Sequence, residues 1–142
     1  MKLVKHLLES KGQQIISIAE EASVLEAIKL MAERSIGSLL VMRGGELKGI
    51  VTERDYARKV IVKGRSSKST QVKEIMTAKV CTAKTNQTVN ECMTVMTERR
   101  IRHLPVVEDG EVLGLISIGD LVQAIIADQQ EEIEQLEQYI SG

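Results

Sequence analysis

Apolar residues follow a helical period at the start of the chain. Leu3, Val4, Leu7 and Leu8 recur at the spacing of one helix face, which predicts a first helix that stops at Gly12. Beyond this point the apolar residues form short runs and alternations, and these are typical of strands.

Between residues 13 and 62, short apolar runs surround one helical stretch and predict a unit of strand, helix, strand, strand and helix. Ser23 directly precedes the helical positions and is expected to cap them. Gly44 and Gly45 separate two apolar runs that can pair as a hairpin. The predicted elements are a strand over 14–19, a helix after Ser23, strands over 36–42 and 47–51, and a helix over 55–62.

The same series of elements then occurs again. Residues 15–59 align with residues 80–124 without a gap, and twelve of these forty-five pairs are identical. Such self-similarity indicates a tandem duplication. The second copy predicts a strand over 80–83, a helix over 89–98 after Thr88, strands over 101–107 and 112–117, and a helix from about Asp120 to Ile140.

The end of the chain predicts an acidic helical extension. Ile126, Ile133 and Ile140 are seven residues apart and Leu136 lies between them, so one side of the helix stays apolar while the other carries carboxylates. We expect such an arm to pack on its own domain or on a second copy of the chain.

The segment between the two copies, residues 63–71, is polar and small and reads as a linker. Two interpretations are open: a solvated linker, which we favour, or a surface that contacts phosphate. Its basic residues and their neighbours are Lys59, Lys63, Arg65, Lys68 and Lys73.

The best-matched stretches are residues 49–55 and 114–120. Each reads as a glycine, two aliphatic residues, a hydroxyl, two variable residues and an aspartate. A strand is expected to end at the hydroxyl, and a helix to start near the aspartate.

Thr52-x-x-Asp55 and Ser117-x-x-Asp120 can each be explained as a capping box, in which side chains satisfy the free N–H groups of a helix start. A second explanation is a binding site. Helix N-termini hold phosphates, a nearby carboxylate can accept both hydroxyls of a ribose, and aliphatic strands can enclose a base. The duplication strengthens this second explanation.

Composition excludes several other functions. Apolar residues make up 43% of the chain, so it can bury a core. A net charge of −1 lacks the basic surplus typical of nucleic-acid binding. Tyr56 and Tyr139 are the only aromatic residues, so stacking platforms for single-stranded bases are absent. Nucleic acid is therefore not an expected partner.

Catalytic and metal-binding patterns are also missing from the sequence. It shows no Ser/His/Asp or Cys/His constellation and no carboxylate pair, so we expect no enzymatic activity and no metal. Cys81 and Cys92 lack metal-ligand spacing. Without an apolar leader or a membrane-length apolar run, we expect reduced thiols, no membrane partner and a cytoplasmic location.

Taken together, these motifs resemble tandem cystathionine-β-synthase (CBS) domains, also called Bateman modules. The family's Gly-h-h-Thr/Ser-x-x-Asp motif matches residues 49–55 and 114–120, its second-strand motif matches 100–107, and its lead-in to the second domain matches 74–77. The resemblance implies an α/β (α+β) fold of two β-α-β-β-α repeats with pseudo-two-fold symmetry, in a small stand-alone CBS-pair protein. The expected segments are an N-terminal helix at 1–12, a first repeat at 13–62, a basic linker at 63–73, a second repeat at 74–127 and an acidic helical extension at 128–142.

The resemblance also implies a regulatory module that binds AMP, ADP, ATP or NAD, with no prosthetic group, in clefts between the repeats. S-adenosylmethionine is an alternative ligand, and a protein-interaction scaffold without a small ligand is an alternative function. The family's pairs usually form homodimers, and the protein target is left open.

In the family, the motif aspartate holds the ribose and the motif hydroxyl helps to hold phosphate. The resemblance assigns one cleft to Ile50, Thr52, Arg54, Asp55, Met76, Lys79, Val80, Cys81 and Ile101. It assigns the other to Gln14, Ile15, Ile16, Ile36, Leu115, Ser117 and Asp120. Arg102 and His103 occupy positions where family members place phosphate-binding cations.

The two copies differ at one strand. The first copy has Ser35-Ile36-Gly37-Ser38-Leu39-Leu40 where the second has Arg100-Ile101-Arg102-His103-Leu104-Pro105. Because the first lacks the cations and the proline, the two clefts are not expected to be equivalent. The cation at Arg102 should lower the pKa of His103 and make it a poor general base.

Overall fold

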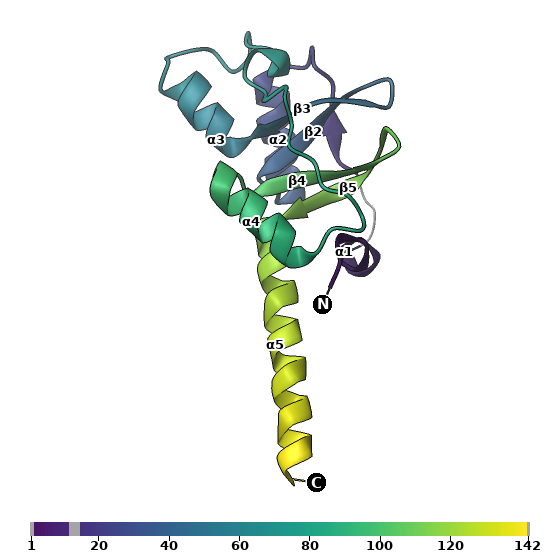
Figure 1. Cartoon of the computed structure of the whole chain (residues 1–142). Helices are drawn as coiled ribbons and strands as arrows, with labels where there is room; N and C mark the ends of the chain where they lie inside the picture. The colour runs from purple at the N-terminus through teal and green to yellow at the C-terminus, as the bar shows by residue number, and fades with distance from the viewer. Residues whose placement is uncertain (1, 12–14, 142) are drawn as a thin grey trace. The chain divides into compact units, whose positions relative to one another are not determined.

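The computed structural model describes residues 2–11 and 15–141. Helices and strands are mixed (Figure 1), as the predicted α+β fold requires, and the described strands form one three-stranded and one two-stranded sheet. The elements in chain order are α1 Val4–Lys11, β1 Ser17–Ile18, α2 Val24–Arg34, β2 Ser38–Arg43, β3 Glu46–Thr52, α3 Glu53–Tyr56, η1 Ala57–Ile61, η2 Val72–Glu74, α4 Val89–Arg99, β4 His103–Glu108, β5 Glu111–Ser117 and α5 Ile118–Ser141.

The chain divides into two compact units. Unit 1 takes in Met1–Gln13, Thr82–Glu108 and Leu113–Gly142, and unit 2 takes in Gln14–Cys81 and Asp109–Val112. Helix α1 therefore belongs with the second repeat, whereas the sequence suggested a separate N-terminal segment.

Unit 2 contains the three-stranded sheet. Strand β1 pairs parallel with β2, and β2 pairs antiparallel with β3. The turn between β2 and β3 uses Gly44 and Gly45, whose φ angles are 58° and 82°. Left-handed backbone at both central residues is what a two-residue hairpin turn requires, so the glycines explain the hairpin.

Helix α2 begins where its capping residue predicted. The Ser23 side chain accepts a hydrogen bond from the backbone N–H of Glu26 at 3.1 Å. At the other end, Ser35 adopts left-handed backbone with φ 55° and ends the helix. The predicted cap at Ser23 is confirmed.

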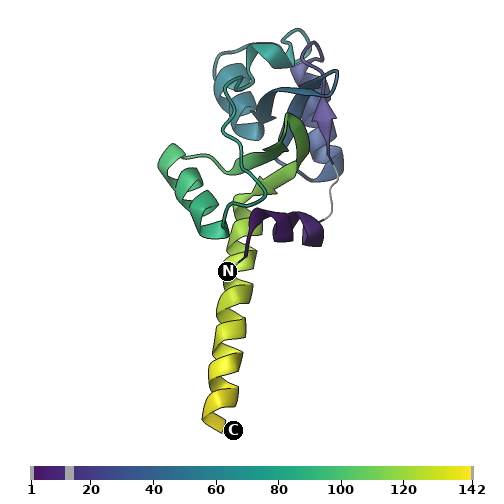
Figure 2. The ribbon, with the colours of Figure 1, turned by 45° about the vertical axis from the view of Figure 1, so that its right-hand side comes forward.

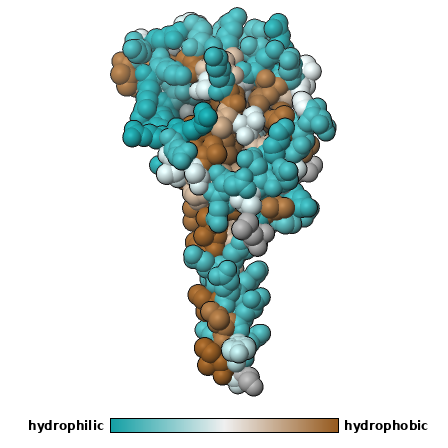
Figure 3. All heavy atoms as spheres, in the orientation of Figure 1, coloured by the Kyte–Doolittle hydropathy of each residue, from teal (hydrophilic) through white to brown (hydrophobic). Residues whose placement is uncertain are grey.

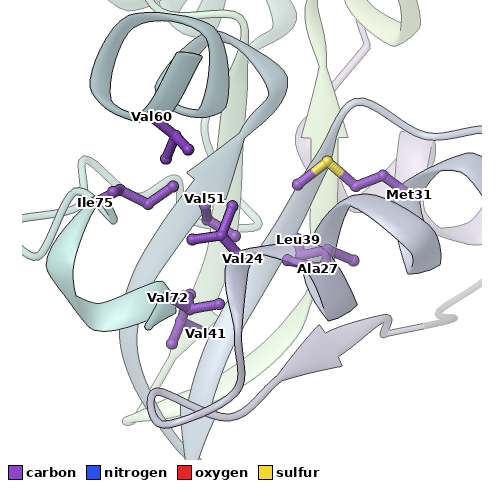
Figure 4. Packing of buried hydrophobic residues seen from close by; sticks show 9 residues of the cluster. All are labelled: Val24, Ala27, Met31, Leu39, Val41, Val51, Val60, Val72 and Ile75. Atoms are coloured by element: carbon purple, nitrogen blue, oxygen red, sulfur yellow. The ribbon is translucent and has the colours of Figure 1, made fainter. Parts of the chain in front are cut away.

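The core of unit 2 collects side chains from the sheet, from α2, from η1 and from the segment that follows η1 (Figure 4). Two residues of β2 that share one face of the strand, and residues of α2 at helical spacing, point into this cluster. Its buried members are Val24, Ala27, Met31, Leu39, Val41, Val51, Val60, Val72 and Ile75.

The segment between the repeats is exposed over most of residues 63–71, but its backbone contacts α2. The carbonyl groups of Ser67 and Thr70 accept hydrogen bonds from the N–H groups at the start of α2, at 3.0 and 2.8 Å. Val72 and Ile75 are fully buried in the core of unit 2. The backbone of this segment thus satisfies the free donors of a helix N-terminus.

In unit 1, α1 is tied to the loop before α4. The N–H groups of Val4 and Lys5 donate to the carbonyls of Gln87 and Thr85, at 2.9 and 3.0 Å. Figures 1 and 2 both show α1 beside the first turns of α5. Buried side chains of this unit include Leu7, Leu8, Val89, Cys92, Met96, Leu104, Val106, Ile116 and Leu121.

The predicted strand over 80–83 is wrong, because only a single parallel bridge joins Ala83 to Val106. In unit 2 the N–H of Leu40 donates to the carbonyl of Ile16, and this bond extends the pairing of β1 with β2. Pro105 occupies the position of Leu40 in the second copy. A proline has no N–H, so the equivalent bond cannot form.

Helix α5 is buried only near its start. Leu121 and Ala124 are its buried residues, whereas every residue from 129 to 141 is exposed. The expectation that this extension packs on its own domain is therefore wrong. Among the helices of the described residues, none combines the length and the apolar character needed to cross a membrane.

Candidate functional site

The first copy of the glycine-hydroxyl-aspartate motif lies where β3 passes into α3. The Thr52 hydroxyl accepts a hydrogen bond from the Asp55 N–H at 3.1 Å, and the Asp55 carboxylate accepts one from the Thr52 N–H at 3.0 Å. This is a complete capping box. The predicted change from strand to helix at Thr52 is confirmed.

The second copy has the same geometry where β5 passes into α5. The Ser117 hydroxyl accepts from the Asp120 N–H at 3.2 Å, and the Asp120 carboxylate accepts from the Ser117 N–H at 2.8 Å. Both aspartates therefore hold a structural position that fixes the direction of the carboxylate. Such a fixed, half-buried carboxylate is suited to accept further hydrogen bonds from a ligand.

Each aspartate also pairs with a lysine, but the lysines come from different elements. Asp55 pairs with Lys59 one turn along the chain, at 3.1 Å. Lys59 also donates to the carbonyl of Ile75 at 2.7 Å. In unit 2 the cation thus comes from the segment of chain that directly follows the motif.

In unit 1 the cation comes from α1, far away in the sequence. The Lys11 ammonium donates to the Asp120 carboxylate at 2.7 Å and to the Leu115 carbonyl at 2.8 Å. Burial acts to raise the pKa of Asp120, but the hydrogen bonds from Lys11 and Ser117 outweigh it, and the pKa lies below its ordinary value of 3.8. Asp120 is therefore ionised at neutral pH.

Sequence reasoning did not single out Lys11, although a signal for it exists. Val4-Lys5-His6-Leu7-Leu8 matches Val72-Lys73-Glu74-Ile75-Met76, and the same offset aligns Lys11 with Lys79. The structure supports this alignment at two glycines. A Cβ added at Gly49 would meet the Met76 side chain at 2.8 Å, and one at Gly114 would meet the Leu8 side chain at 2.8 Å.

His103 lies in the same unit as Asp120 and is half-buried at the start of β4. Burial lowers the pKa of His103 below its ordinary value of 6.5, and Lys11 and Arg102 lower it further, while Asp120 acts to raise it. The predicted direction is confirmed, but burial is the main cause rather than Arg102. The neutral imidazole therefore predominates at pH 7, and an anion beside it would favour the protonated form.

The remaining residues expected around Asp55 lie mostly in unit 2. The segment after η2 meets β3 through a reciprocal pair of hydrogen bonds, Ile50 N–H to Thr77 O at 3.0 Å and Thr77 N–H to Ile50 O at 2.9 Å. Of these residues, Ile50 is buried, Met76, Val80 and Cys81 are half-buried, and Arg54 and Lys79 are exposed. The exception is Ile101, which is half-buried and belongs to unit 1.

The residues expected around Asp120 are divided between the units. Leu115 and Ser117 lie in unit 1 with Asp120, and both are half-buried. Ile15 is exposed and Ile16 and Ile36 are half-buried, and all three belong to unit 2. Gln14 lies outside the described residues.

A hollow of about 390 Å³ lies beside Asp120 between α1 and α5, within unit 1. Polar side chains from both helices line it, among them Lys2, His6, Ser10, Lys11, Asp120 and Gln123. Residues 2–11 and 15–141 contain no cluster of three His, Cys, Asp or Glu side chains that could hold a metal ion.

Comparison with protein families gives a match over most of the chain. The family model described as "CBS domain" matches residues 5–62 and again residues 72–127. Both capping boxes, both aspartates and Lys11 fall inside the matched ranges.

Individual relatives agree with this match. The chain is 41% identical to the mitochondrial CBS domain-containing protein CBSX3 of Arabidopsis thaliana, over 98% of this chain and 72% of that protein. A solved structure of a signal-transduction protein with CBS domains from Burkholderia ambifaria is 53% identical, with a TM-score of 0.87 over 90% of this chain and 96% of that one. The CBS domain pair of protein MJ0100, solved in complex with 5′-methylthioadenosine and S-adenosyl-L-methionine, is 28% identical, with a TM-score of 0.80 over 90% of this chain and 98% of that one.

Proposed function

Since this chain belongs to the CBS domain family and carries the domain twice, we propose that it is a non-enzymatic regulatory module that binds an adenine nucleotide. The observation that carries this proposal is the pair of half-buried aspartates, each held by a capping box at a helix start. A carboxylate fixed in this way can accept the two hydroxyls of a ribose.

The groups near Asp120 favour a phosphorylated ligand. Lys11 contacts Asp120 directly, and His103 is close enough to Lys11 and Asp120 for both to shift its pKa. Cationic groups near a ribose-binding carboxylate can neutralise a phosphate or pyrophosphate. The corresponding strand of the first copy has Gly37 and Ser38 in place of Arg102 and His103, so we expect the Asp120 site to bind the more highly charged ligands.

S-adenosylmethionine is a second candidate because the CBS pair of MJ0100 was solved with that ligand and with 5′-methylthioadenosine. These ligands share the adenosine group with the nucleotides but carry no phosphate. Lys11 and Arg102 repel the sulfonium and ammonium groups of S-adenosylmethionine, and its single carboxylate offers them less negative charge than the phosphates of a nucleotide do. We therefore favour AMP, ADP, ATP or NAD over S-adenosylmethionine.

Isothermal titration calorimetry with a ligand series tests this order. We expect adenosine to bind more weakly than AMP, and S-adenosylmethionine to bind more weakly than ATP or NAD, because the added phosphates meet the cations of unit 1. Equal heats for buffer and for every ligand would contradict nucleotide binding and leave the scaffold function.

Two further parts of the proposal have separate tests. We propose that the chain forms a homodimer, which sedimentation velocity would show as a doubled mass at micromolar concentration. We also propose that bound nucleotide is not turned over, so ATP or NAD incubated with the protein should be recovered unchanged by chromatography. A monomer would contradict the first part, and a reaction product that depends on the protein would contradict the second.

A further inference from the structure

The outer part of α5, residues 129–141, has a surface that the candidate nucleotide site does not use. All of these residues are exposed. The exposed fractions of Ile133, Leu136 and Ile140 are 54%, 61% and 82%. Figure 3 shows brown apolar groups among teal polar ones in the lower part of the view, where Figure 1 places α5. An apolar stripe along an otherwise polar helix usually packs against another element.

The apolar residues of α5 follow a heptad repeat. Ile126, Ile133 and Ile140 fall at position a, and Val122 and Leu136 fall at position d. These side chains lie along one seam of the helix, as they do in a coiled coil. Gln129 is the single polar residue at a d position, where a polar group fixes the alignment of two paired helices.

Charge pairs do not stabilise residues 129–141 as a helix. The stretch contains four glutamates and no basic residue, so acid–base pairs one turn apart cannot form. The last turn also lacks a basic residue to oppose the helix dipole. An isolated helix of this length is marginal in water, so the seam is suited to be covered by another helix.

The charged residues beside the apolar seam of α5 determine which kind of partner helix can pair with it. Glu132 at position g and Glu137 at position e flank the seam, and residues at e and g choose the partner in coiled coils. Two copies of this stretch would place no basic residue opposite Glu132 or Glu137, because within 129–141 the e and g positions hold only glutamate, glutamine or tyrosine. A helix with lysine or arginine at its e and g positions would form attractive pairs at the same places.

We propose that residues 129–141 of α5 are a docking surface for a basic amphipathic helix of a different protein. The isoleucine and leucine seam supplies the apolar contact, Gln129 fixes the alignment, and Glu132 and Glu137 select a basic partner. This surface does not depend on nucleotide binding, and a homodimer formed through other surfaces leaves it available.

Two synthetic peptides test the proposal against the full-length chain. Both contain three heptads with Ile at a and Leu at d; one has Lys at e and g, and the other has Glu there. Fluorescence anisotropy should show the lysine peptide binding at least about ten-fold more tightly than the glutamate peptide at low salt, with a smaller difference at high salt. Equal affinities would overturn the proposal.

Substitutions in α5 locate the surface and test the role of charge. The double variant Ile133→Asp, Leu136→Asp should lose binding of the lysine peptide, and the exposed Val62→Asp, which lies outside α5, should keep it. Glu132→Lys with Glu137→Lys should reverse the preference toward the glutamate peptide. Unchanged binding in the first variant, or an unchanged preference in the charge-reversed one, would overturn the assignment.

Sedimentation velocity on the same proteins examines the competing occupant. If a second copy covers this seam, the double variant Ile133→Asp, Leu136→Asp will dissociate into a smaller species than the unsubstituted chain. That result would overturn the proposal. We expect the two proteins to sediment with the same mass, because the tails of two copies repel each other.

Discussion

Lys11 and Asp120 form an ion pair in which the two side chains are 43% and 23% exposed. Solvent screens a pair of this exposure, so it stabilises the fold by only about 0.5–1 kcal/mol. The ion pair also lowers the proton affinity of the Asp120 carboxylate. The pKa of Asp120 lies below 3.8 in the folded chain, so the folded state holds the ionised form more strongly than the unfolded state does.

The substitution Lys11→Met should therefore lower the free energy of unfolding at pH 7 by about 0.5–1 kcal/mol. The contribution of Asp120 is present above pH 3.8 and disappears as the pH falls through its lower folded value. In urea titrations, the difference between Lys11→Met and the unsubstituted chain should thus shrink as the pH falls below 3.8. Lys5→Met removes an exposed cation from the same helix and is the control. A difference that stays constant over this range would contradict the pairing.

His103 is expected to make nucleotide binding depend on pH. Burial and Lys11 hold its pKa below 6.5 in the ligand-free chain, and a bound phosphate would raise it. Binding is then tighter at low pH, because the anion favours the protonated imidazole. The affinity for NAD, whose pyrophosphate does not titrate near neutrality, should rise by roughly three- to ten-fold from pH 8 to pH 6. His103→Gln should flatten this profile, and an unchanged slope in that variant would remove His103 from the site.

At the scale of elements, each unit has a glycine that lies close to a neighbouring segment. The atoms that a side chain at this glycine would contact differ between the two units. A Cβ at Gly49 would lie 2.7 Å from the backbone oxygen of Thr77, which is itself bonded to Ile50. A Cβ at Gly114 would meet only the tip of the Leu8 side chain, at 2.8 Å. A side-chain tip can move aside, whereas a paired backbone cannot.

Gly49→Ala should therefore cost about 2–3 kcal/mol of folding free energy, and Gly114→Ala about 1 kcal/mol or less. The two substitutions are matched because the positions are equivalent in the duplication. Urea unfolding of both variants, with the unsubstituted chain as reference, measures the difference. A larger cost at Gly114 than at Gly49 would show that Leu8 is the more rigid neighbour.

Local chemistry was enough to predict the elements that carry the motif. Ser23, Thr88 and the two hydroxyl–aspartate pairs form caps with partners three residues away, and the paired glycines form the turn that their backbone freedom suggests. These features depend on neighbours in the sequence, so pattern reasoning finds them.

Long-range packing decided the features that were not predicted. Lys11 reaches Asp120 across 109 residues of chain, and this contact exists because α1 packs with the second repeat rather than with the first. The failed strand at 80–83 has a local cause on its partner strand, since Pro105 removes one donor. The proline is visible in the sequence as a difference between the copies. Its effect on the strand over 80–83 follows only once the pairing of that segment with β4 is known.

At the scale of the whole molecule, both units contain an aspartate that is held by a capping box and paired with a lysine, but the lysine comes from a different element in each unit. Unit 2 pairs its aspartate with Lys59 from the same helical segment, and unit 1 pairs its aspartate with Lys11 from α1. We therefore expect two binding events of unequal affinity rather than two identical ones.

The most direct measurement is calorimetric titration of one adenine nucleotide, ATP, into the unsubstituted chain, Asp55→Asn and Asp120→Asn. Asparagine keeps an acceptor for the capping bond but loses the charge that holds a ribose, and Asp128→Asn on α5 serves as the control. We predict that in each of the two motif variants the affinity of one of the two binding events falls by at least about ten-fold. The control should bind ATP like the unsubstituted chain. Affinities unchanged in both motif variants would contradict the claim that these aspartates hold the ligand.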